Sequence, residues 1–490
     1  MVVAISYGSP GKVMICNSDS IDRLVTYAAE LPAVNIPRQV MDKTKQLLLD
    51  TIGCMLAGSS ADGIRELKQA ALFWGGNPSA RIFGFDDMTT PPEAACINSA
   101  MAHAHDYDDT HDEALNHGCV TLVPALLALC DGLSRGSPPR TGGSLGGKTS
   151  VEPTITGREF TAALAIGLDV ANRIALTFIR YLHVGWLPTT LSGPFACAAA
   201  CGRILGLDRR QMYHAFGFAY ARVHGNRQAL ADGALAKRIQ PGFSASAGLR
   251  AALYACHGLS GARNIIDGEF GMAALYTGGR LDAEHLTDNL GTIFETSNVS
   301  VKPYPSCRCT HPVIDAALRL AVDPGVGART IKAGTISLPP ASMGQIGRPF
   351  RVGDNPTVDA QFNASYTAAL AFTEGRPKLA HFRRDFVISR RDLIELAGRF
   401  RTVEFEKHRA TLVPIEMRIE LTDGKKFEAR VEHAKGSPAY PATMAEIEEK
   451  FDDCLDTCIK AYDSPERRRI KDAVDSVLDI ENIGALIACL

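Results

Sequence analysis

Side chains that can carry or exchange a proton concentrate between His103 and His117, where they make up ten of fifteen residues. Apolar stretches lie on either side, at residues 94–104 and 120–129, and such stretches are typical of buried helices. Charged groups held between buried segments cost free energy unless they are paired or used in chemistry. We therefore take residues 103–117, the His/Asp segment, as the first candidate for an active site.

A metal site is one interpretation of the His/Asp segment, because His103 and His105 have the spacing of metal ligands. The metallohydrolase pattern H-x-H-x-D-H is not met, since Tyr107 and Asp108 occupy its last two places. No second group of residues with ligand spacing follows elsewhere in the sequence. We therefore predict that the site holds no metal.

A structural role and acid–base chemistry are the other interpretations. Four acidic residues of the segment could cap helices or face water without any further function: Asp108, Asp109, Asp112 and Glu113. Alternatively, the histidines and carboxylates act as acids and bases on an anionic small molecule. That chemistry requires cations, which must come from other parts of the chain.

Two lysine-containing segments can supply these cations. Lys237 lies in residues 236–243, which we expect to connect two helices. Residues 300–311 carry Lys302 among prolines, aromatic residues and cysteines, a setting unlike that of a solvated surface lysine. The other candidates of this second segment are Tyr304, Cys307, Arg308, Cys309 and His311. The two cysteines flank the arginine and are expected to have a lowered pKa, whereas their C-x-C-x-H pattern is only a weak indication of a metal.

Residues 142–149 match the nucleotide-binding P-loop pattern letter for letter. A P-loop is delivered by a strand and followed by a helix whose N–H groups face the phosphates. Here Ser-Pro-Pro-Arg precedes the pattern, and Pro153 follows five residues after Lys148. We therefore predict an exposed loop over residues 134–153 and no bound nucleotide.

The composition is that of an ordinary globular protein. The chain has 490 residues, enough for two domains, and its formal charge of −2 gives no sign of a nucleic-acid or membrane partner. Uninterrupted apolar runs of about 18 residues, which would predict a membrane span, are absent from the sequence. The first twenty residues lack a secretory or transit pattern, and many of the thirteen cysteines lie in apolar segments, as reduced thiols do. These features predict a cytoplasmic protein.

Apolar residues at helical spacing predict a large all-helical domain in the first part of the chain. Its helices are expected over residues 40–56, 158–172, 194–205, 210–221 and 244–257. Gly58 lies where the first of them should end. The later helices are rich in small residues, which indicates that they are buried among one another.

Strand signals begin near residue 298. Residues 330–338 read as a strand and residues 414–431 as a hairpin. Thr443 then begins a capping-box pattern that opens another helix, and a final helix ends the chain. The predicted fold is mostly α with a smaller α+β domain: a helical domain at 1–297, completed by 438–490, and an α+β lid domain at 298–437.

Six segments together resemble the MmgE/PrpD family, which includes 2-methylcitrate dehydratase, the cis-aconitate decarboxylases and iminodisuccinate epimerase. They are residues 48–53, 98–110 with His117, 236–242, 268–271, 302–311 and 348–350. Their order and spacing hold over roughly residues 20–485. The set is specific for the family, and none of its members is specific for one reaction.

The resemblance implies a fold, a site and an assembly. Proteins of this family have a helical domain with a smaller α+β lid domain, need no metal or organic cofactor, and are typically homodimers. Their site lies in a pocket between the two domains. Carried over residue by residue, that site would contain Asp106, Thr110, His117, Lys237 and Lys302.

Two positions depart from the family pattern. Leu187 stands where decarboxylase and dehydratase relatives have a histidine, and His183 is nearby but out of register. Cys307 stands where many dehydratases have a histidine five residues after the lid lysine, and some fungal-type decarboxylases and the epimerase-like branch share this cysteine. Both departures bear on which reaction of the family is catalysed.

The expected function is that of a cofactor-independent lyase acting on a citrate- or aconitate-like polycarboxylate. Dehydration or decarboxylation would pass through a carbanion stabilised by cations. Substrate binding is expected from Lys237, Lys302, Arg308 and His103. His117 is expected to be the main acid–base group, oriented by Asp106. Thr110 would donate a hydrogen bond, and the second acid–base group would be Cys307, Tyr304 or His311.

Two other functions stay open. An isomerase or epimerase is favoured by Cys307 and by the absence of a histidine at Leu187, because proton transfer by a cysteine can invert a carbon without elimination. A non-catalytic protein that binds tricarboxylates is the other, since a fold does not guarantee an activity. Solvent deuterium exchange into recovered substrate would indicate the first, and tight binding without turnover the second.

Overall fold

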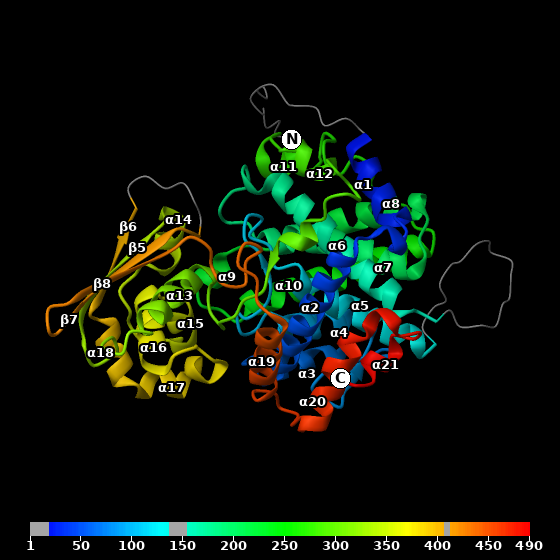
Figure 1. Cartoon of the computed structure of the whole chain (residues 1–490). Coiled ribbons are helices and arrows are strands. Elements are labelled where there is room, and N and C mark those ends of the chain that lie inside the picture. Colours follow the sequence, from blue (N-terminus) through cyan, green and yellow to red (C-terminus); the bar gives the residue numbers. More distant parts are fainter. Residues whose placement is uncertain (1–18, 137–153, 406–411) are drawn as a thin grey trace, which may run out of the picture.

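The computed structural model describes residues 19–136, 154–405 and 412–490 (Figure 1). The loop predicted over residues 134–153 therefore lies largely outside the described residues, and so does the pattern that resembles a P-loop. The helix before this loop ends at Ser134, where the prediction placed the start of the loop.

Buried apolar side chains form two main clusters. The larger draws mainly on residues 21–301 and again on residues 447–490, and the smaller on residues 304–431. Figure 1 shows the corresponding arrangement, with a large helical body and a smaller body that carries the sheet. The elements of the last fifty residues pack on the large body, next to α2.

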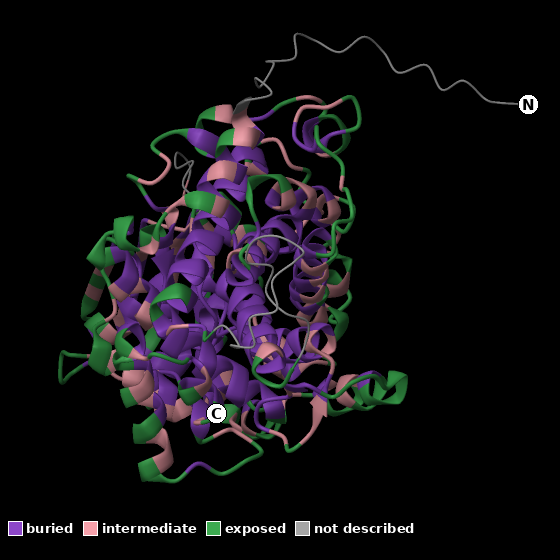
Figure 2. Cartoon of the chain, turned by 90° about the vertical axis from the view of Figure 1, so that its right-hand side faces the viewer, coloured by how far each residue is buried: buried purple, intermediate pink, exposed green. Residues whose placement is uncertain are grey.

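Long helices make up the large body, and most of their surfaces are buried, as Figure 2 shows. Those described are α1 (Asp19–Glu30), α2 (Arg38–Ala57), α3 (Ile64–Trp74), α4 (Pro91–Ala102), α5 (Cys119–Ser134), α6 (Gly157–Ile179), α7 (Pro188–Leu205), α8 (Arg209–Tyr220), α9 (Gln228–Ala231), α10 (Ala236–Cys256), α11 (Met272–Thr277), α12 (Ala283–Thr287), α19 (Met444–Leu455), α20 (Ser464–Asp475) and α21 (Gly484–Ile487). Two short strands, β1 (Ala80–Arg81) and β2 (Met88–Thr89), pair with each other.

The small residues of these helices allow close contacts, as the sequence predicted. A Cβ atom on Gly248 of α10 would lie 2.4 Å from the Cβ of Cys197 in α7. A Cβ atom on Gly242 would lie 2.4 Å from the backbone oxygen of Cys96 in α4. Helix α10 therefore packs tightly between α7 and α4, and neither glycine can be replaced without movement of the backbone.

Two helices begin earlier than predicted. Helix α10 begins at Ala236 instead of residue 244, so Lys237 lies in the first turn of a helix and not in a connection. Helix α7 begins at Pro188 instead of residue 194. Prolines misled the prediction, because Pro241 and Pro194 lie inside these helices and proline normally ends one. Packing of the buried helices offsets the hydrogen bond that each proline lacks.

Helix α6 is long and apolar enough to cross a membrane by length and composition, with a mean hydropathy of 1.6 over its best window. Within the fold, 94% of that window is buried. Helices α2 and α3 pass the same test only as a pair, which is bent by 90°. The burial of α6 is that of a central core helix packed against α7 and α2.

The smaller body is built on a four-stranded sheet with the order β6-β5-β7-β8. Its strands are β5 (Ile331–Leu338), β6 (Phe400–Glu404), β7 (Ile415–Leu421) and β8 (Lys426–Val431), and its helices are α13 (His311–Leu320), α14 (Pro340–Ile346), α15 (Pro356–Gln361), α16 (Ala364–Glu374), α17 (Arg384–Ser389) and α18 (Arg391–Ala397). The predicted strand and hairpin are confirmed, with Met417 opposite Ala429. Strand β6, parallel to β5, was not predicted.

A two-residue ladder joins the His/Asp segment to the start of the smaller body. Strand β3 (Thr110–His111) pairs antiparallel with β4 (Val299–Ser300), so that Thr110 lies opposite Ser300. Lys302 follows β4 by two residues. This pairing explains how a lysine almost two hundred residues away in the chain comes to lie beside the carboxylates of the His/Asp segment.

A buried ion pair fastens the returning C-terminal segment to the large body. The ammonium group of Lys450 in α19 lies 2.5 Å from Asp50 in α2, and both side chains are almost completely buried. The same ammonium group also donates to the backbone oxygen of Tyr107. The capping box predicted at Thr443 is present at the start of α19 and aligns this helix.

Replacement of Lys450 by methionine is expected to lower the free energy of unfolding by about 3–5 kcal/mol, because it leaves Asp50 charged, buried and without its partner. Urea denaturation of the full chain measures this loss. Lys471→Met serves as the control, since its partner Asp452 is largely exposed and such pairs contribute about 1 kcal/mol or less. Equal losses for the two variants would contradict the assignment.

Candidate active site

The His/Asp segment connects two buried helices, as the sequence predicted. Helix α4 ends at Ala102, with His103 as its C-cap residue, and α5 begins at Cys119. Asp106 has a positive φ of 52°, a left-handed conformation that is rare for residues other than glycine. The ammonium group of Lys302 donates to the backbone oxygen of Asp106 at 3.1 Å. Strained backbone held in place by a specific contact is typical of functional sites.

Two lysines converge on the side chain of Asp106. The Nζ atom of Lys237 lies 2.8 Å from its Oδ2, and the Nζ atom of Lys302 lies 3.6 Å from its Oδ1. Burial raises the pKa of Asp106, but the two ammonium groups lower it more, so this pKa lies far below that of a free aspartate. The pKa of Lys302 is raised, because Asp108 and Asp106 outweigh the effect of burial. The three groups are therefore all charged at neutral pH.

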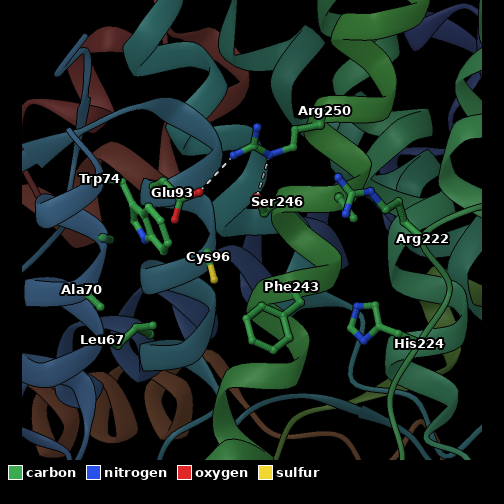
Figure 3. A pocket seen from close by; sticks show the side chains of 12 residues that line it. Leu67, Ala70, Trp74, Glu93, Cys96, Arg222, His224, Phe243, Ser246 and Arg250 are labelled. Carbon is green, nitrogen blue, oxygen red and sulfur yellow. Dashed lines mark hydrogen bonds and ion pairs between the residues drawn. The ribbon is translucent and has the colours of Figure 1, made fainter. Parts of the chain in front are cut away.

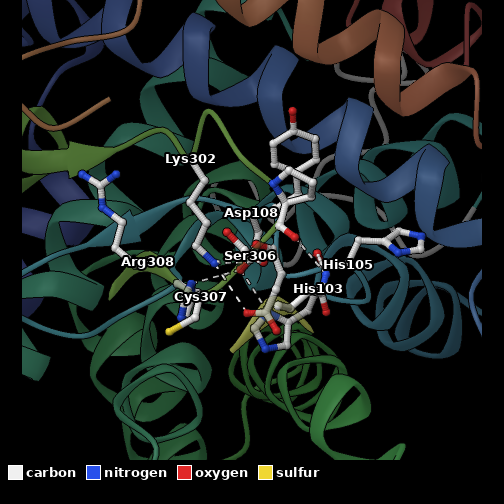
Figure 4. A network of polar contacts seen from close by, with 12 residues as sticks. His103, His105, Asp108, Lys302, Ser306, Cys307 and Arg308 are labelled. Atoms are coloured by element: carbon white, nitrogen blue, oxygen red, sulfur yellow. Dashed lines mark hydrogen bonds and ion pairs between the residues drawn. The ribbon is translucent and has the colours of Figure 1, made fainter. Parts of the chain in front are cut away.

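Asp108 and not Asp106 contacts His117, which corrects the expectation from the sequence (Figure 4). The Oδ2 atom of Asp108 lies 3.0 Å from Nδ1 of His117 and 2.9 Å from Nδ1 of His103. Asp108 is completely buried, so the interpretation of it as a solvated or capping carboxylate is wrong. Asp106 points to the lysines, and the neighbouring Asp108 points to the histidines.

The two histidines differ in exposure. The His103 side chain is 7% exposed and that of His117 is 24% exposed. Burial and the charge of Lys237 lower the pKa of His103 to about 4, so this ring is neutral at physiological pH. Lys237 has an exposed fraction similar to that of His117, at 21%. A small molecule would therefore meet the cluster at Lys237 and His117.

Asp109 is a second buried carboxyl group beside the site. Its Oδ2 accepts a hydrogen bond from the backbone N–H of Cys119, and its Oδ1 has no partner among the described residues. Burial and the neighbouring Asp108 raise the pKa of Asp109 to about 6. Between about pH 4 and pH 6 the folded chain binds more protons here than the unfolded chain, so the folded state loses stability as the pH rises through this window.

Replacement of Asp109 by asparagine is expected to remove this cost. The difference between the two pKa values corresponds to up to about 3 kcal/mol. Relative to the original protein, the variant should therefore gain about 2–3 kcal/mol in the free energy of unfolding between pH 4.5 and pH 7.5. Urea denaturation at the two pH values measures the gain. A difference between the two proteins that does not change with pH would show that Asp109 is already ionised at pH 4.5.

Arg308, Tyr304 and His311 are engaged in other contacts. Arg308 forms a bidentate ion pair with Asp112, with both N–O distances at 3.0 Å, and also donates to the backbone oxygen of Lys435. These contacts tie the His/Asp segment to the smaller body. They also occupy the guanidinium group that the sequence assigned to substrate binding.

The hydroxyl group of Tyr304 donates to Asp315 at 2.8 Å. The imidazole of His311 lies 3.2 Å from the backbone oxygen of Ser306, and burial with the charge of Arg308 lowers its pKa well below the usual value. Both side chains are buried, at 5% and 0% exposure. Neither side chain has a free polar group directed at Asp106 or His117.

Cys307 lies near Lys302, but its thiol does not have the lowered pKa that the sequence predicted. A hydrogen bond with the Cys309 thiol and burial raise the pKa of Cys307 well above the usual value. The same hydrogen bond lowers the pKa of Cys309. Cys307 is therefore held as a neutral thiol, because a neighbouring sulfur and not Arg308 dominates its surroundings.

Several residues around the site were not found from the sequence. Thr189 in α7 accepts a hydrogen bond from the backbone N–H of His117 at 2.9 Å, and Leu187 directly precedes this helix. Gln361 joins the two bodies by donating to the backbone oxygens of His105 and Pro305. The ring of Phe362 lies 5.8 Å from Nζ of Lys237. No motif marks these residues, because they act through single contacts made by distant parts of the chain.

A divalent metal does not fit the cluster well. His103, Asp108 and His117 offer three possible ligand atoms within 4.8 Å of one another. However, Nδ1 of His117 also lies 2.6 Å from the backbone oxygen of Asp109, and such a contact requires a proton on that nitrogen. Lys302 lies 3.9 Å from the remaining oxygen of Asp108 and would repel a cation. We therefore derive no chemical step from a metal.

The arrangement combines two fixed positive charges with a partly exposed imidazole. The ammonium groups can hold carboxylates of a substrate or stabilise negative charge that develops on it. The imidazole can transfer a proton near neutral pH. Thr110, the remaining predicted residue, is buried in β3, opposite Ser300 of β4.

Comparison with known proteins agrees with this architecture. Residues 22–284 match the MmgE/PrpD N-terminal domain, and residues 304–476 match the MmgE/PrpD C-terminal domain. The chain is 28% identical over 485 residues to a cis-aconitate decarboxylase-like protein of Aspergillus oryzae, covering 95% of this chain and 96% of that protein.

It is also similar to the cis-aconitate decarboxylases of Aspergillus terreus, at 26% identity, and of Homo sapiens, at 25% identity. Both matches cover 84% of this chain, with 84% of the Aspergillus terreus protein and 83% of the human protein. The two domain matches span most of the chain and follow the order of its two bodies. The chain therefore belongs to the MmgE/PrpD family.

Proposed function

We propose that the chain is a cofactor-independent lyase that removes CO2 from an aconitate-like polycarboxylate. The observation that carries the proposal is the convergence of Lys237 and Lys302 on Asp106, next to the His117–Asp108 pair. Polycarboxylates offer the negative charges that two fixed ammonium groups select. The relatives named as cis-aconitate decarboxylases support loss of CO2 over loss of water.

Substrate binding would use the accessible side of the cluster. A carboxylate of the substrate can approach Lys237, whose ammonium group is partly exposed, while Lys302 remains buried against Asp106 and Asp108. Asp106 holds both ammonium groups in place before the substrate arrives. Preorganised charges of this kind stabilise a transition state without having to reorient during the reaction.

The chemical step would break one carbon–carbon bond. One carboxylate leaves as CO2, and the electron pair of the broken bond stays on the substrate, where it spreads over the adjacent double bond towards a second carboxylate. The lysines stabilise this negative charge. The imidazolium form of His117 then donates the proton from Nε2 to carbon, and a proton from water restores it. The balance is one proton consumed and one CO2 released.

The experiment that tests this function is an NMR assay with cis-aconitate, citrate, 2-methylcitrate and alkyl-substituted analogues in D2O. Release of CO2 from one compound is the expected result. Deuterium uptake into recovered substrate, without loss of CO2 or water, would establish an isomerase instead. Binding of a tricarboxylate without any turnover would establish a non-catalytic protein.

We also propose that two copies associate through the surface of α3 and α10. Trp74 and Phe243 are 77% and 52% exposed there, and a pocket of about 400 Å³ lies between these helices (Figure 3). Arg250 and Glu93 form an ion pair at this pocket. Large exposed aromatic side chains rimmed by charges are typical of protein interfaces, and a two-fold axis lets the same patch serve both copies.

The double variant Trp74→Glu and Phe243→Glu is expected to convert a dimer into a monomer of 52.6 kDa, because four buried charges would face one another across the interface. Light scattering after size-exclusion chromatography at micromolar concentration measures the mass. Val322→Glu, at an equally exposed site on the smaller body, should leave the dimer intact. A monomeric original protein would contradict the assignment.

A cytoplasmic location is the remaining proposal. All cysteines among the described residues are free thiols, and most of them are buried. Reduced thiols in this number are typical of a reducing compartment.

A further inference from the structure

The shared carboxylate of Asp108 has a consequence that extends the proposed function and rests on it. One oxygen, Oδ2, lies 2.9 Å from Nδ1 of His103 and 3.0 Å from Nδ1 of His117. The other oxygen makes no hydrogen bond among the described residues and lies 3.9 Å from Nζ of Lys302. Both histidines are therefore coupled to a single buried negative charge.

The acceptors around the rings fix the tautomer of each histidine. Nδ1 of His117 faces the Asp108 carboxylate and the backbone oxygen of Asp109, at 3.0 Å and 2.6 Å. Both of these groups only accept hydrogen bonds, so Nδ1 must carry the proton. Nδ1 of His103 faces the same carboxylate oxygen and carries a proton for the same reason. In each neutral ring, Nε2 is then left without a proton.

The charges nearby limit how many protons the two rings can hold. The ring centroids are 5.3 Å apart, and both rings share one carboxylate with Lys302. Two imidazolium rings would therefore place three positive charges around Asp108. His103 is the more deeply buried ring and is closer to neutrality, whereas His117 is partly exposed. An additional proton is thus more stable on His117.

We propose that Asp108 is a positioning residue that makes His103 and His117 a unit holding one exchangeable proton, located on Nε2 of His117. His103 occupies the shared oxygen with its own N–H and so lowers the affinity of Asp108 for a proton. Asp108 consequently stays ionised while His117 gains and loses its proton. The carboxylate orients His117 and stabilises its cationic form without itself taking part in the transfer.

The first test is the tautomeric state of the resting enzyme, observed by NMR on protein with ¹⁵N-labelled histidine. Neutral His103 and His117 should both carry the proton on Nδ1, and only His117 should become cationic between pH 5 and pH 8. Histidine-to-glutamine variants at the two positions assign the signals. A proton on Nε2 of either neutral ring, or two rings that both become cationic in this range, would overturn the proposal.

The second test is the variant Asp108→Asn, whose amide can accept from only one ring through its single oxygen. We expect kcat to fall by about 10²–10⁴-fold, with a smaller change in KM. The pH–rate limb that reports the His117 cation should move to lower pH, because the stabilising negative charge is gone. An unchanged pH profile would contradict the role of Asp108.

Glu295→Gln is the matched control. Glu295 pairs with His111 of the same segment at 3.1 Å and makes no contact with His103 or His117. Its variant should leave the two tautomers and the pH profile unchanged. Because the tautomers are measured without substrate, the tests separate the two proposals. Correct tautomers without turnover would refute the lyase alone, and turnover with other tautomers would refute the unit alone.

Discussion

Replacement of Lys302 by methionine is expected to lower both activity and stability more than any other single change. Loss of a fixed positive charge next to the developing negative charge should reduce kcat by at least about 10²–10³-fold. The variant also leaves Asp106 and Asp108 with fewer partners in a buried setting, which should cost about 3–5 kcal/mol in the free energy of unfolding. Steady-state kinetics and urea denaturation measure the two effects.

Lys332→Met is the control for this variant. The Lys332 side chain is 62% exposed and pairs with Glu420 on the surface of the sheet, so its loss should change stability by about 1 kcal/mol or less and leave kcat unchanged. If Lys302→Met kept the original kcat while losing stability, Lys302 would be a structural lysine. The account of charge stabilisation would then have to rely on Lys237 alone.

Replacement of His117 by alanine is expected to reduce kcat by about 10²–10⁴-fold, because the proton donor for the carbon is lost. Stability should change little, since the ring is partly exposed and contributes no buried charge of its own. Added imidazole should restore part of the activity, because the vacated space is reachable from solvent. The dependence of kcat on imidazole concentration measures this rescue.

His111→Gln serves as the comparison within the same segment. His111 is completely buried and contacts Glu295 and the backbone N–H of Ala114. Its replacement should lower stability, while kcat stays within a few-fold of the original value. An active His117→Ala variant, or one without rescue that has also lost its fold, would remove His117 from the proposed mechanism.

The sequence was informative wherever a local pattern determines the structure. The apolar stretches around the His/Asp segment became α4 and α5, and alternation over residues 414–431 became the hairpin β7–β8. The capping box at Thr443 starts α19 as predicted. Each of these features depends on periodicity or on a side chain contacting its own neighbourhood, and so it can be read without knowledge of the fold.

The sequence could not assign partners within the His/Asp segment. Asp106 and Asp108 are two residues apart, and which of them faces His117 depends on the left-handed backbone of Asp106. The bidentate pair between Arg308 and Asp112 joins residues from the two bodies, so no local pattern reveals that Arg308 is already engaged. The raised pKa of Cys307 likewise depends on where the neighbouring Cys309 thiol points.

The balance of charge explains why the cluster is stable when buried. Lys237 and Lys302 face the carboxylates of Asp106 and Asp108, while both histidines lean on Asp108 as neutral donors. Burial of each charge alone would be costly, but paired and hydrogen-bonded charges are tolerated. A polycarboxylate that enters this cluster replaces solvent with fixed ammonium groups, which is the condition for stabilising a carbanion.

The most direct test of the proposed reaction is the ratio of CO2 released to deuterium incorporated at carbon when cis-aconitate is turned over in D2O. The account predicts a ratio of one, because each bond to a departing carboxylate is replaced by one bond to a proton delivered from His117. Deuterium in recovered cis-aconitate without release of CO2 would contradict it, as would release of water in place of CO2.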